Sequence, residues 1–291
     1  MPVEQFICLN GEFIKKKETI FYYNNRSFRY GDGLFETIKV NSKKIYFFQE
    51  HYNRLTSGMK LLKFDIPEKW SIKYFHGLII RLLNINRLFQ GARVRLTVFR
   101  SYGGFYTPEN NNCEFLIEAD YYEHEDYVLN SKGLKMGIYT EVLKPINLLS
   151  NIKSNNSLIY ILAGLYKKAN YYDDCFIVNE RGNISEAVSS NVFVISGKNI
   201  YTPALNEGCV NGIIRNQILD IATALRFIVY EEAVITENDL LKADEIFLTN
   251  AISGIKWVVA FKEKRYFCNL SKMFLKQLNI RANSEQDLQE Y

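Results

Sequence analysis

The chain has 291 residues, 47% hydrophobic and 23% charged, which is ordinary globular usage and excludes a wholly disordered, collagenous or coiled-coil protein. At roughly 150 residues per domain, the length predicts two domains. The formal net charge of +4 is too small for the basic surface that nucleic-acid binding requires, so no nucleic-acid partner is expected.

The amino-terminal sequence, the cysteines and the histidines bear on location and metal binding. Residues 1–5 lack the positive and apolar regions of a signal peptide, and no apolar run approaches the roughly 18 residues that span a bilayer. The five cysteines are widely spaced without a CxxC pair, and the three histidines are scattered. We therefore expect a reduced, cytoplasmic protein with no metal site and no membrane partner.

The first third of the chain alternates between strand and helix patterns. Apolar runs bounded by turn residues predict strands at 6–14, 33–40, 44–48, 93–99 and 114–119. Apolar residues at helical spacing predict helices at 51–62 and 68–83. Residues 101–108 predict a long loop. Residues 120–131 are charged and aromatic without a clear period, so we place a domain boundary there.

The second part of the chain continues this mixture. The sequence predicts strands at 175–178, 190–195 and 245–248. It predicts helices at 154–170, 212–225 and 271–281, the first of them with Ser154 as its N-cap. The polar tail, 283–291, is expected to fray. No internal repeat is present, and the organisation predicts two domains, residues 1–122 and 123–291.

Lys153 and Glu186 are the first candidates for chemistry. A lysine between a strand-like segment and a helix start is usually only solvated. Partial desolvation beside Ile152 would favour the neutral amine that a Schiff base requires. An acid just before a strand is commonly a turn residue. Beside a pyridine nitrogen, however, the carboxylate of Glu186 would keep that nitrogen protonated and make the ring an electron sink.

Two turns have the character of anion sites. Residues 208–215 lead a Gly-containing loop into a helix start, whose free backbone amides suit an anion, although a plain loop-to-helix turn has the same pattern. A second turn of this kind, 249–254, follows the strand at 245–248. Together with Arg54, the two turns could hold one phosphate.

These segments, from residues 30–36 to Ile255, resemble in order and spacing the fold-type IV pyridoxal phosphate enzymes, or class-IV aminotransferase superfamily. The superfamily includes branched-chain and D-amino-acid aminotransferases and 4-amino-4-deoxychorismate lyase. The resemblance implies a two-domain α/β (α+β) fold, with a small N-terminal domain and a larger C-terminal domain built on a pseudo-barrel sheet. It also implies pyridoxal 5'-phosphate as the cofactor, a small amino-acid-like substrate and a homodimer.

The same resemblance implies roles for individual residues. Lys153 looks like the catalytic lysine that binds the cofactor, and Glu186 looks like the partner of the pyridine nitrogen. The positions that match the phosphate site are Arg54, Gly212, Ile213, Asn250 and Ala251. Tyr30 and Glu36 match positions near the substrate, and Asn191 matches the residue that orders the signature turn. Lys144 has no such match, so its replacement is expected to have a mild effect.

Departures from the family pattern bear on the reaction. Ile214 stands where the aminotransferases usually have Thr, and Val188 replaces a usually small residue. The Arg-x-His pair of the D-amino-acid aminotransferases is absent, whereas 210–213 and 250–251 resemble the lyases. The sequence favours a lyase that produces 4-aminobenzoate and pyruvate. The alternative is an aminotransferase that acts on branched-chain or D-amino acids with a 2-keto acid acceptor. The presence of both Lys153 and Glu186 argues against a non-catalytic relative.

Arg100 is the candidate for binding the two substrate carboxylates. It ends the strand at 93–99 and opens the loop at 101–108. The alternative is a surface residue at the end of a strand. Arg93 and Arg95 alternate with apolar residues, so they share one face of the sheet and could be merely solvated.

Overall fold

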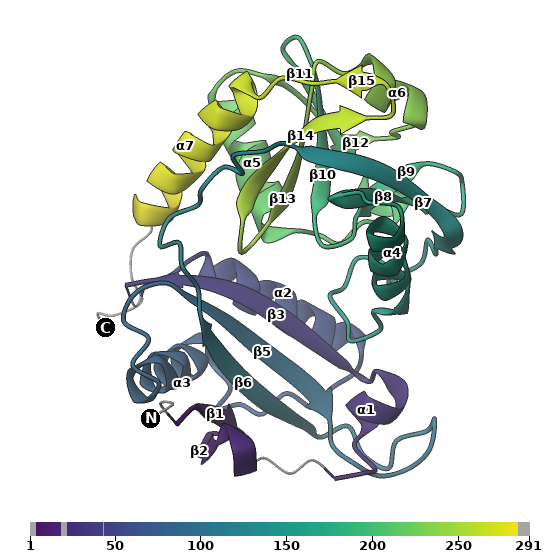
Figure 1. The fold of residues 1–291 in the computed structure, drawn as a ribbon. Helices are drawn as coiled ribbons and strands as arrows, with labels where there is room; N and C mark the ends of the chain where they lie inside the picture. Colours follow the sequence, from purple (N-terminus) through teal and green to yellow (C-terminus); the bar gives the residue numbers. More distant parts are fainter. Residues whose placement is uncertain (1–3, 19–21, 43, 285–291) are drawn as a thin grey trace. The chain divides into compact units, whose positions relative to one another are not determined.

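A computed structural model describes residues 4–18, 22–42 and 44–284, which form two compact units (Figure 1). Within those residues, unit 1 comprises the chain up to Asp126, the segment Lys153–Asn156, and Ser284; unit 2 comprises Tyr127–Ile152 and Ser157–Asn283. The boundary predicted between residues 122 and 123 lies inside unit 1, close to its end. Each unit combines a sheet with helices, which confirms the two-domain α/β class.

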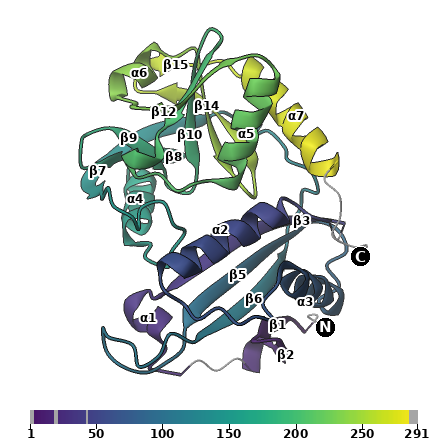
Figure 2. The same ribbon diagram turned by 180° about the vertical axis from the view of Figure 1, so that it is seen from behind.

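Unit 1 is built on a six-stranded antiparallel sheet with the strand order β2-β1-β6-β5-β3-β4. Helices α2 (Phe48–Leu61) and α3 (Ile72–Ile85) lie across one face of the sheet (Figure 2). The short elements are η1 (Lys16–Glu18) and α1 (Arg26–Tyr30). The strands are β1 (Phe6–Leu9), β2 (Glu12–Lys15), β3 (Gly33–Asn41), β4 (Lys44–Ile45), β5 (Ala92–Arg100) and β6 (Cys113–Tyr121).

The single strand predicted at 6–14 is wrong, because the chain reverses there. Asn10 and Gly11 have φ angles of 53° and 99°, and β1 pairs with β2 so that Leu9 lies opposite Glu12. A two-residue turn with both φ angles positive is the type I' hairpin turn, for which Asn-Gly is the preferred sequence. The reversal is therefore encoded locally, in the Asn10-Gly11 dipeptide. The strand predicted at 44–48 is shorter than expected, because α2 already begins at Phe48.

Unit 2 is built on a nine-stranded mixed sheet. The strand order is β12-β11-β10-β13-β14-β7-β8-β9, and β15 pairs with β14. Its strands are β7 (Leu134–Lys144), β8 (Asp174–Asn179), β9 (Ile184–Ala187), β10 (Asn191–Ser196), β11 (Asn199–Pro203), β12 (Ile228–Ala233), β13 (Glu245–Asn250), β14 (Gly254–Phe261) and β15 (Lys264–Arg265). The longest of them, β7, was not predicted.

Strands across the nine-stranded sheet contribute to one large apolar core. Buried side chains from both halves of the sheet, among them Phe176 of β8, Val192 of β10 and Phe261 of β14, belong to a single cluster. Helix α4 (Leu158–Ala169) packs on β7 and β8, and α5 (Ile213–Ala224) packs on β12 and β13. The remaining helices are η2 (Leu205–Glu207), α6 (Glu237–Lys242) and α7 (Asn269–Ser284).

Helix α4 begins later than the sequence predicts. Its N-cap position is Ser157, not Ser154. Ser154 instead forms an isolated antiparallel bridge with Leu34 of β3, so the segment before the helix adds to the sheet of unit 1. The predicted fraying at 283–291 concerns residues that, apart from Asn283 and Ser284, lie outside the described residues. Among the described residues, none of the helices combines the length and apolar character needed to cross a membrane.

Candidate functional site

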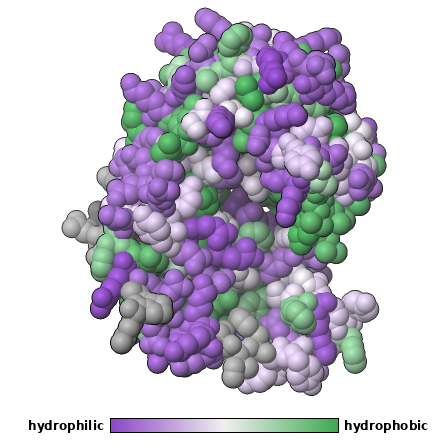
Figure 3. All heavy atoms as spheres, viewed as in Figure 1, coloured by the Kyte–Doolittle hydropathy of each residue, from purple (hydrophilic) through white to green (hydrophobic). Residues whose placement is uncertain are grey.

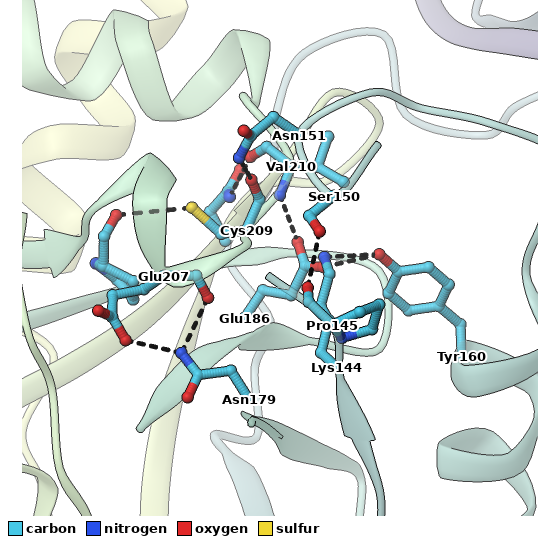
Figure 4. Close-up of polar contacts among 12 residues, drawn as sticks. Lys144, Pro145, Ser150, Asn151, Tyr160, Asn179, Glu186, Glu207, Cys209 and Val210 are labelled. Carbon is cyan, nitrogen blue, oxygen red and sulfur yellow. Dashed lines mark hydrogen bonds and ion pairs between the residues drawn. The ribbon is translucent and has the colours of Figure 1, made fainter. Parts of the chain in front are cut away.

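Glu186 lies at the centre of a buried polar cluster in unit 2 (Figure 4). It belongs to β9, all four residues of which are buried, and is itself 3% exposed. Its Oε1 forms an ion pair with the Lys144 ammonium and accepts a hydrogen bond from the Tyr160 hydroxyl at 2.7 Å. Its Oε2 accepts a hydrogen bond from the backbone N–H of Val210 at 3.0 Å. A cation, a hydroxyl and an amide therefore hold one carboxylate.

The protonation states around Glu186 follow from burial and from its charge. Burial, reinforced by the negative charge of Glu186, raises the pKa of the Tyr160 phenol, so Tyr160 is a neutral hydrogen-bond donor. Burial and Glu186 also raise the pKa of Cys209 to about 11, against the opposing charges of Arg215 and Lys144. Cys209 is accordingly an unreactive thiol at neutral pH.

The loop before α5 is held by two asparagines. Asn191 donates from Nδ2 to the carbonyl of Val210 at 2.8 Å, and Asn151 donates to the carbonyls of Leu205 and Cys209, both at 2.7 Å. Gly212 is the N-cap of α5 and makes no side-chain capping hydrogen bond. The amides of the first helical turn, starting at Ile213, have no partner within the helix, which makes this end of α5 suited to an anion.

Asn250 organises the second predicted turn. Its Oδ1 accepts hydrogen bonds from the amides of Ile252 and Ser253 at 3.1 and 2.8 Å, and its Nδ2 donates to Ser190 Oγ at 3.0 Å. Strand β13, which Asn250 ends, pairs with β10 so that Thr249 lies opposite Asn191. Unit 2 thus links four of the predicted site elements by hydrogen bonds and strand pairing: Glu186, the 210–213 loop, Asn191 and the Asn250–Ala251 turn.

Lys153 belongs to unit 1 and is placed by β3. Its carbonyl accepts the N–H of Phe35 at 3.0 Å, and the N–H of Asn155 donates to the carbonyl of Gly33 at 2.9 Å. Its ammonium nitrogen lies 4.4 Å from the centre of the Phe35 ring. Backbone pairing of Lys153 and Asn155 with β3 therefore positions the backbone of the lysine.

Arg54 and Glu36, also in unit 1, bind each other. The Arg54 guanidinium on α2 forms two hydrogen bonds with the Glu36 carboxylate on β3, at 2.8 and 2.5 Å, and His51 Nδ1 lies 2.6 Å from Glu36 Oε2. Burial by itself would raise the pKa of Glu36, but Arg54 and His51 outweigh it and lower the pKa to about 2. Glu36 therefore holds Arg54 in place, and the phosphate role of Arg54 and the substrate role of Glu36 stay predictions.

Arg100 is buried. It is therefore not the surface residue at the end of a strand that the sequence analysis gave as the alternative. It donates to Asp32 at 2.9 Å, to Asn111 at 2.6 Å and to the carbonyl of Leu62 at 2.8 Å. These contacts give it a structural role within unit 1, and substrate binding by Arg100 stays a prediction. Tyr30, the last residue of α1, is partly buried with its ring 5.5 Å from that of Tyr106.

Lys144 and Tyr160 are the members of the Glu186 cluster that the sequence analysis missed. Lys144 is 3% exposed and ends β7. Its burial and its ion pair with Glu186 argue against the mild effect of replacement that the sequence analysis expected. Its ammonium group also donates to the Tyr160 hydroxyl at 2.9 Å. No local signal pointed to Lys144, because the strand that carries it was itself unpredicted. Tyr160 lies in the predicted helix. The sequence alone did not indicate that its side chain would point toward Glu186.

Comparison with known proteins identifies the family that this geometry fits. The family model for amino-transferase class IV matches residues 33–261. The chain is 29% identical to the D-alanine aminotransferase of Staphylococcus aureus strain N315, over 87% of this chain and 88% of that protein. It is 25% identical to the aminodeoxychorismate lyase of Vibrio harveyi, over 79% and 83%. The fold is similar to that of the branched-chain aminotransferase of Thermoproteus uzoniensis, with a TM-score of 0.86, 19% identity and coverage of 94% and 93%.

The residues present suit the cofactor that this family uses, pyridoxal phosphate. A Cβ on Gly212 would lie 1.9 Å from Asn191 Oδ1, so the loop at the start of α5 leaves no room for a side chain. Within the described part of the chain, the buried Thr249 hydroxyl beside Asn250 has no hydrogen-bond partner. A buried carboxylate, an uncapped helix start and an unused hydroxyl are the donors and acceptors that a pyridine nitrogen and a phosphate require.

Proposed function

Because the chain belongs to the amino-transferase class IV family, we propose that this pyridoxal-phosphate-dependent enzyme is a 4-amino-4-deoxychorismate lyase. The reaction is an elimination that produces 4-aminobenzoate and pyruvate. The observation that carries the proposal is the segment 210–213, whose sequence resembles that of the lyases and whose Val210 amide binds Glu186 at 3.0 Å. Ile214, at the position of a usual aminotransferase Thr, is buried and offers no hydroxyl to a phosphate.

The site residues divide the work of this reaction. The cofactor, when bound, supplies an electron sink for the pair left behind when a proton leaves the substrate α-carbon. Lys153 binds the cofactor and then acts as the general base that removes this proton. Glu186 holds the proton of the pyridine nitrogen in place. Arg54, the start of α5 at Gly212–Ile213 and the Asn250–Ala251 turn bind the phosphate.

Substrate binding is assigned to three residues of unit 1: Tyr30, Glu36 and Arg100. Arg100 supplies a positive charge for the carboxylates, although its three donor contacts with Asp32, Asn111 and Leu62 would have to rearrange in part. This rearrangement makes Arg100 the assignment that most needs a test.

The second candidate is an aminotransferase that acts on D- or branched-chain amino acids. It is supported by the 29% identity with a D-alanine aminotransferase across most of both chains. Both reactions begin with the same proton removal by Lys153, so the residues described here serve either one. The two reactions differ only in what happens afterwards to the electron pair left on the substrate α-carbon.

One assay separates the two candidates. The purified enzyme, loaded with pyridoxal phosphate, is given aminodeoxychorismate, and formation of 4-aminobenzoate is followed by its fluorescence. In parallel, a panel of L- and D-amino acids is tested with 2-oxoglutarate for keto acid formation. We expect 4-aminobenzoate and pyruvate in equal amounts, with weak transamination. Fast transamination without 4-aminobenzoate would instead establish the aminotransferase.

We propose that the protein assembles as a homodimer. We also propose that it is located in the cytoplasm. Figure 3 shows hydrophobic residues gathered over α4, where Leu158, Ile161, Leu162 and Leu165 are exposed. Exposed apolar patches of this kind are common at protein interfaces. Ile161→Glu should therefore increase the monomer fraction in light scattering. An unchanged dimer would exclude α4 from the interface, and a monomeric wild-type protein would exclude the dimer itself.

A further inference from the structure

Lys144 is buried beside the functional carboxylate but has no role in the proposed chemistry. It reaches Glu186 from the end of β7, and Tyr160 reaches the same carboxylate oxygen from α4. The side chains of Lys144 and Glu186 are each 4% exposed. A buried ion pair costs desolvation, so two such groups persist together only where each satisfies the other.

Among the residues that the structure describes, Lys144 is the positively charged group in contact with the Glu186 carboxylate. The facing groups are the Tyr160 phenol from α4, the Cys209 thiol, and the Val210 amide from the loop before α5. Tyr160 and Cys209 are neutral because burial raises their pKa values. Arg215, whose charge acts on Cys209, donates to the carbonyls of Pro203 and Glu231.

We propose that Lys144 is a positioning residue that keeps Glu186 ionised and in one orientation through their buried ion pair, with Tyr160 and Val210 completing the carboxylate's contacts. The inference rests on the proposed role of Glu186 toward the pyridine nitrogen. Without the Lys144 cation, Glu186 would be a buried carboxylate with neutral donors only, and burial favours its protonated form. A protonated Glu186 cannot hold a protonated pyridine nitrogen.

The proposal has a consequence for cofactor binding that a purely structural lysine would not have. When Lys144 is replaced by Met, which has a similar length and no charge, Glu186 should take up a proton at a higher pH than in the wild type. As the pH is lowered, the variant should then lose affinity for pyridoxal phosphate at a higher pH than the wild type does. A packing defect alone would weaken binding by the same factor at every pH.

The experiment is a titration of the cofactor-free protein with pyridoxal phosphate, followed by tryptophan fluorescence from acidic to mildly alkaline pH. We expect the acid limb of the Lys144→Met profile to move up by about one pH unit, which is about a tenfold loss of affinity in the acidic range, and to converge with the wild type at high pH. Lys144→Arg should restore the wild-type profile. The matched control is Lys198→Met, at an exposed turn position between β10 and β11.

The outcomes separate this proposal from the proposed function. A Lys144→Met profile parallel to that of the wild type overturns the positioning role. Failure of the wild-type protein to bind pyridoxal phosphate at any pH overturns the function instead. If Lys144→Met does not fold, Lys144→Met/Glu186→Gln decides, because removing both charges should restore folding if their pairing is the reason. A double variant that also fails to fold overturns the proposal.

Discussion

Asn191 and Gly212 are so close that a Cβ on the glycine would lie 1.9 Å from the asparagine Oδ1. The same asparagine donates to the carbonyl of Val210 at 2.8 Å. Asn191 therefore closes the loop onto the start of α5, and only glycine leaves it room. This contact joins two positions to which the sequence analysis gave separate roles, Asn191 in ordering the signature turn and Gly212 in binding phosphate.

Gly212→Ala should consequently distort the loop and weaken the binding of pyridoxal phosphate. We expect a loss of about 1–3 kcal/mol in unfolding free energy from overpacking, and faster loss of cofactor on dialysis. The matched control is Gly164→Ala in α4, where a Cβ would meet nothing within 4 Å, and where Ala should stabilise the helix by up to about 1 kcal/mol. Equal effects of the two substitutions on stability and cofactor retention would contradict this account of Gly212.

Lys153→Ala should abolish nearly all turnover, because the amine that binds the cofactor and removes the proton is lost. Borohydride reduction of the loaded wild-type enzyme, followed by peptide mapping, should find the cofactor on Lys153. Lys198→Ala, at an exposed turn, is the appropriate control, since Lys144 is buried and paired. Recovery of the label on another lysine, or near-normal activity in Lys153→Ala, would remove this residue from the mechanism.

At saturating pyridoxal phosphate, Glu186→Gln should retain cofactor, although with lower affinity, and should slow proton removal by orders of magnitude. The neutral amide no longer favours the protonated pyridine nitrogen, so the electron sink is weakened. Single-turnover kinetics with α-deuterated substrate should show that the proton-transfer step has become slower. An unchanged rate with full cofactor occupancy would mean that another acid holds the nitrogen.

The Glu36–Arg54 pair predicts a specific loss of stability in acid. The folded-state pKa of Glu36 is lowered to about 2, below its ordinary value, so its contribution is present above about pH 4.5 and is lost as the pH falls toward 2. The contribution is on the order of 3 kcal/mol. Glu36→Gln should flatten the dependence of unfolding free energy on pH in that window. An equally steep acid limb in the variant would place the responsible group elsewhere.

Arg100→Ala distinguishes a substrate-binding from a structural arginine. If Arg100 binds substrate, KM should rise sharply, while the absorption band of the bound cofactor stays unchanged. The contacts with Asp32, Asn111 and Leu62 predict in addition a lower melting temperature, since three acceptors lose a charged donor. A lower melting temperature with unchanged KM would exclude Arg100 from the substrate pocket.

Much of this protein was determined locally by its sequence. The strands at 93–99 and 114–119 lie within the observed β5 and β6, because side chains that alternate between two faces leave a two-residue period in the sequence. The cofactor family could be identified from short motifs for a similar reason, since each phosphate-binding turn and its flanking helix start occupy consecutive residues. The Asn10–Gly11 hairpin is equally local, because its dipeptide is the preferred sequence of the type I' turn.

Only the tertiary structure decided which distant groups meet. Lys144 and Glu186 are 42 residues apart on β7 and β9, which lie on either side of β8. β7 itself was not predicted, although Leu134, Met136 and Ile138 alternate with the residues between them and leave a two-residue period. The segment Lys153–Asn156 likewise adds to the edge of β3 in unit 1. The register and pairing of strands depend on backbone hydrogen bonds between remote segments, so no local pattern could specify these contacts, and the charge that holds Glu186 emerged only from the folded sheet.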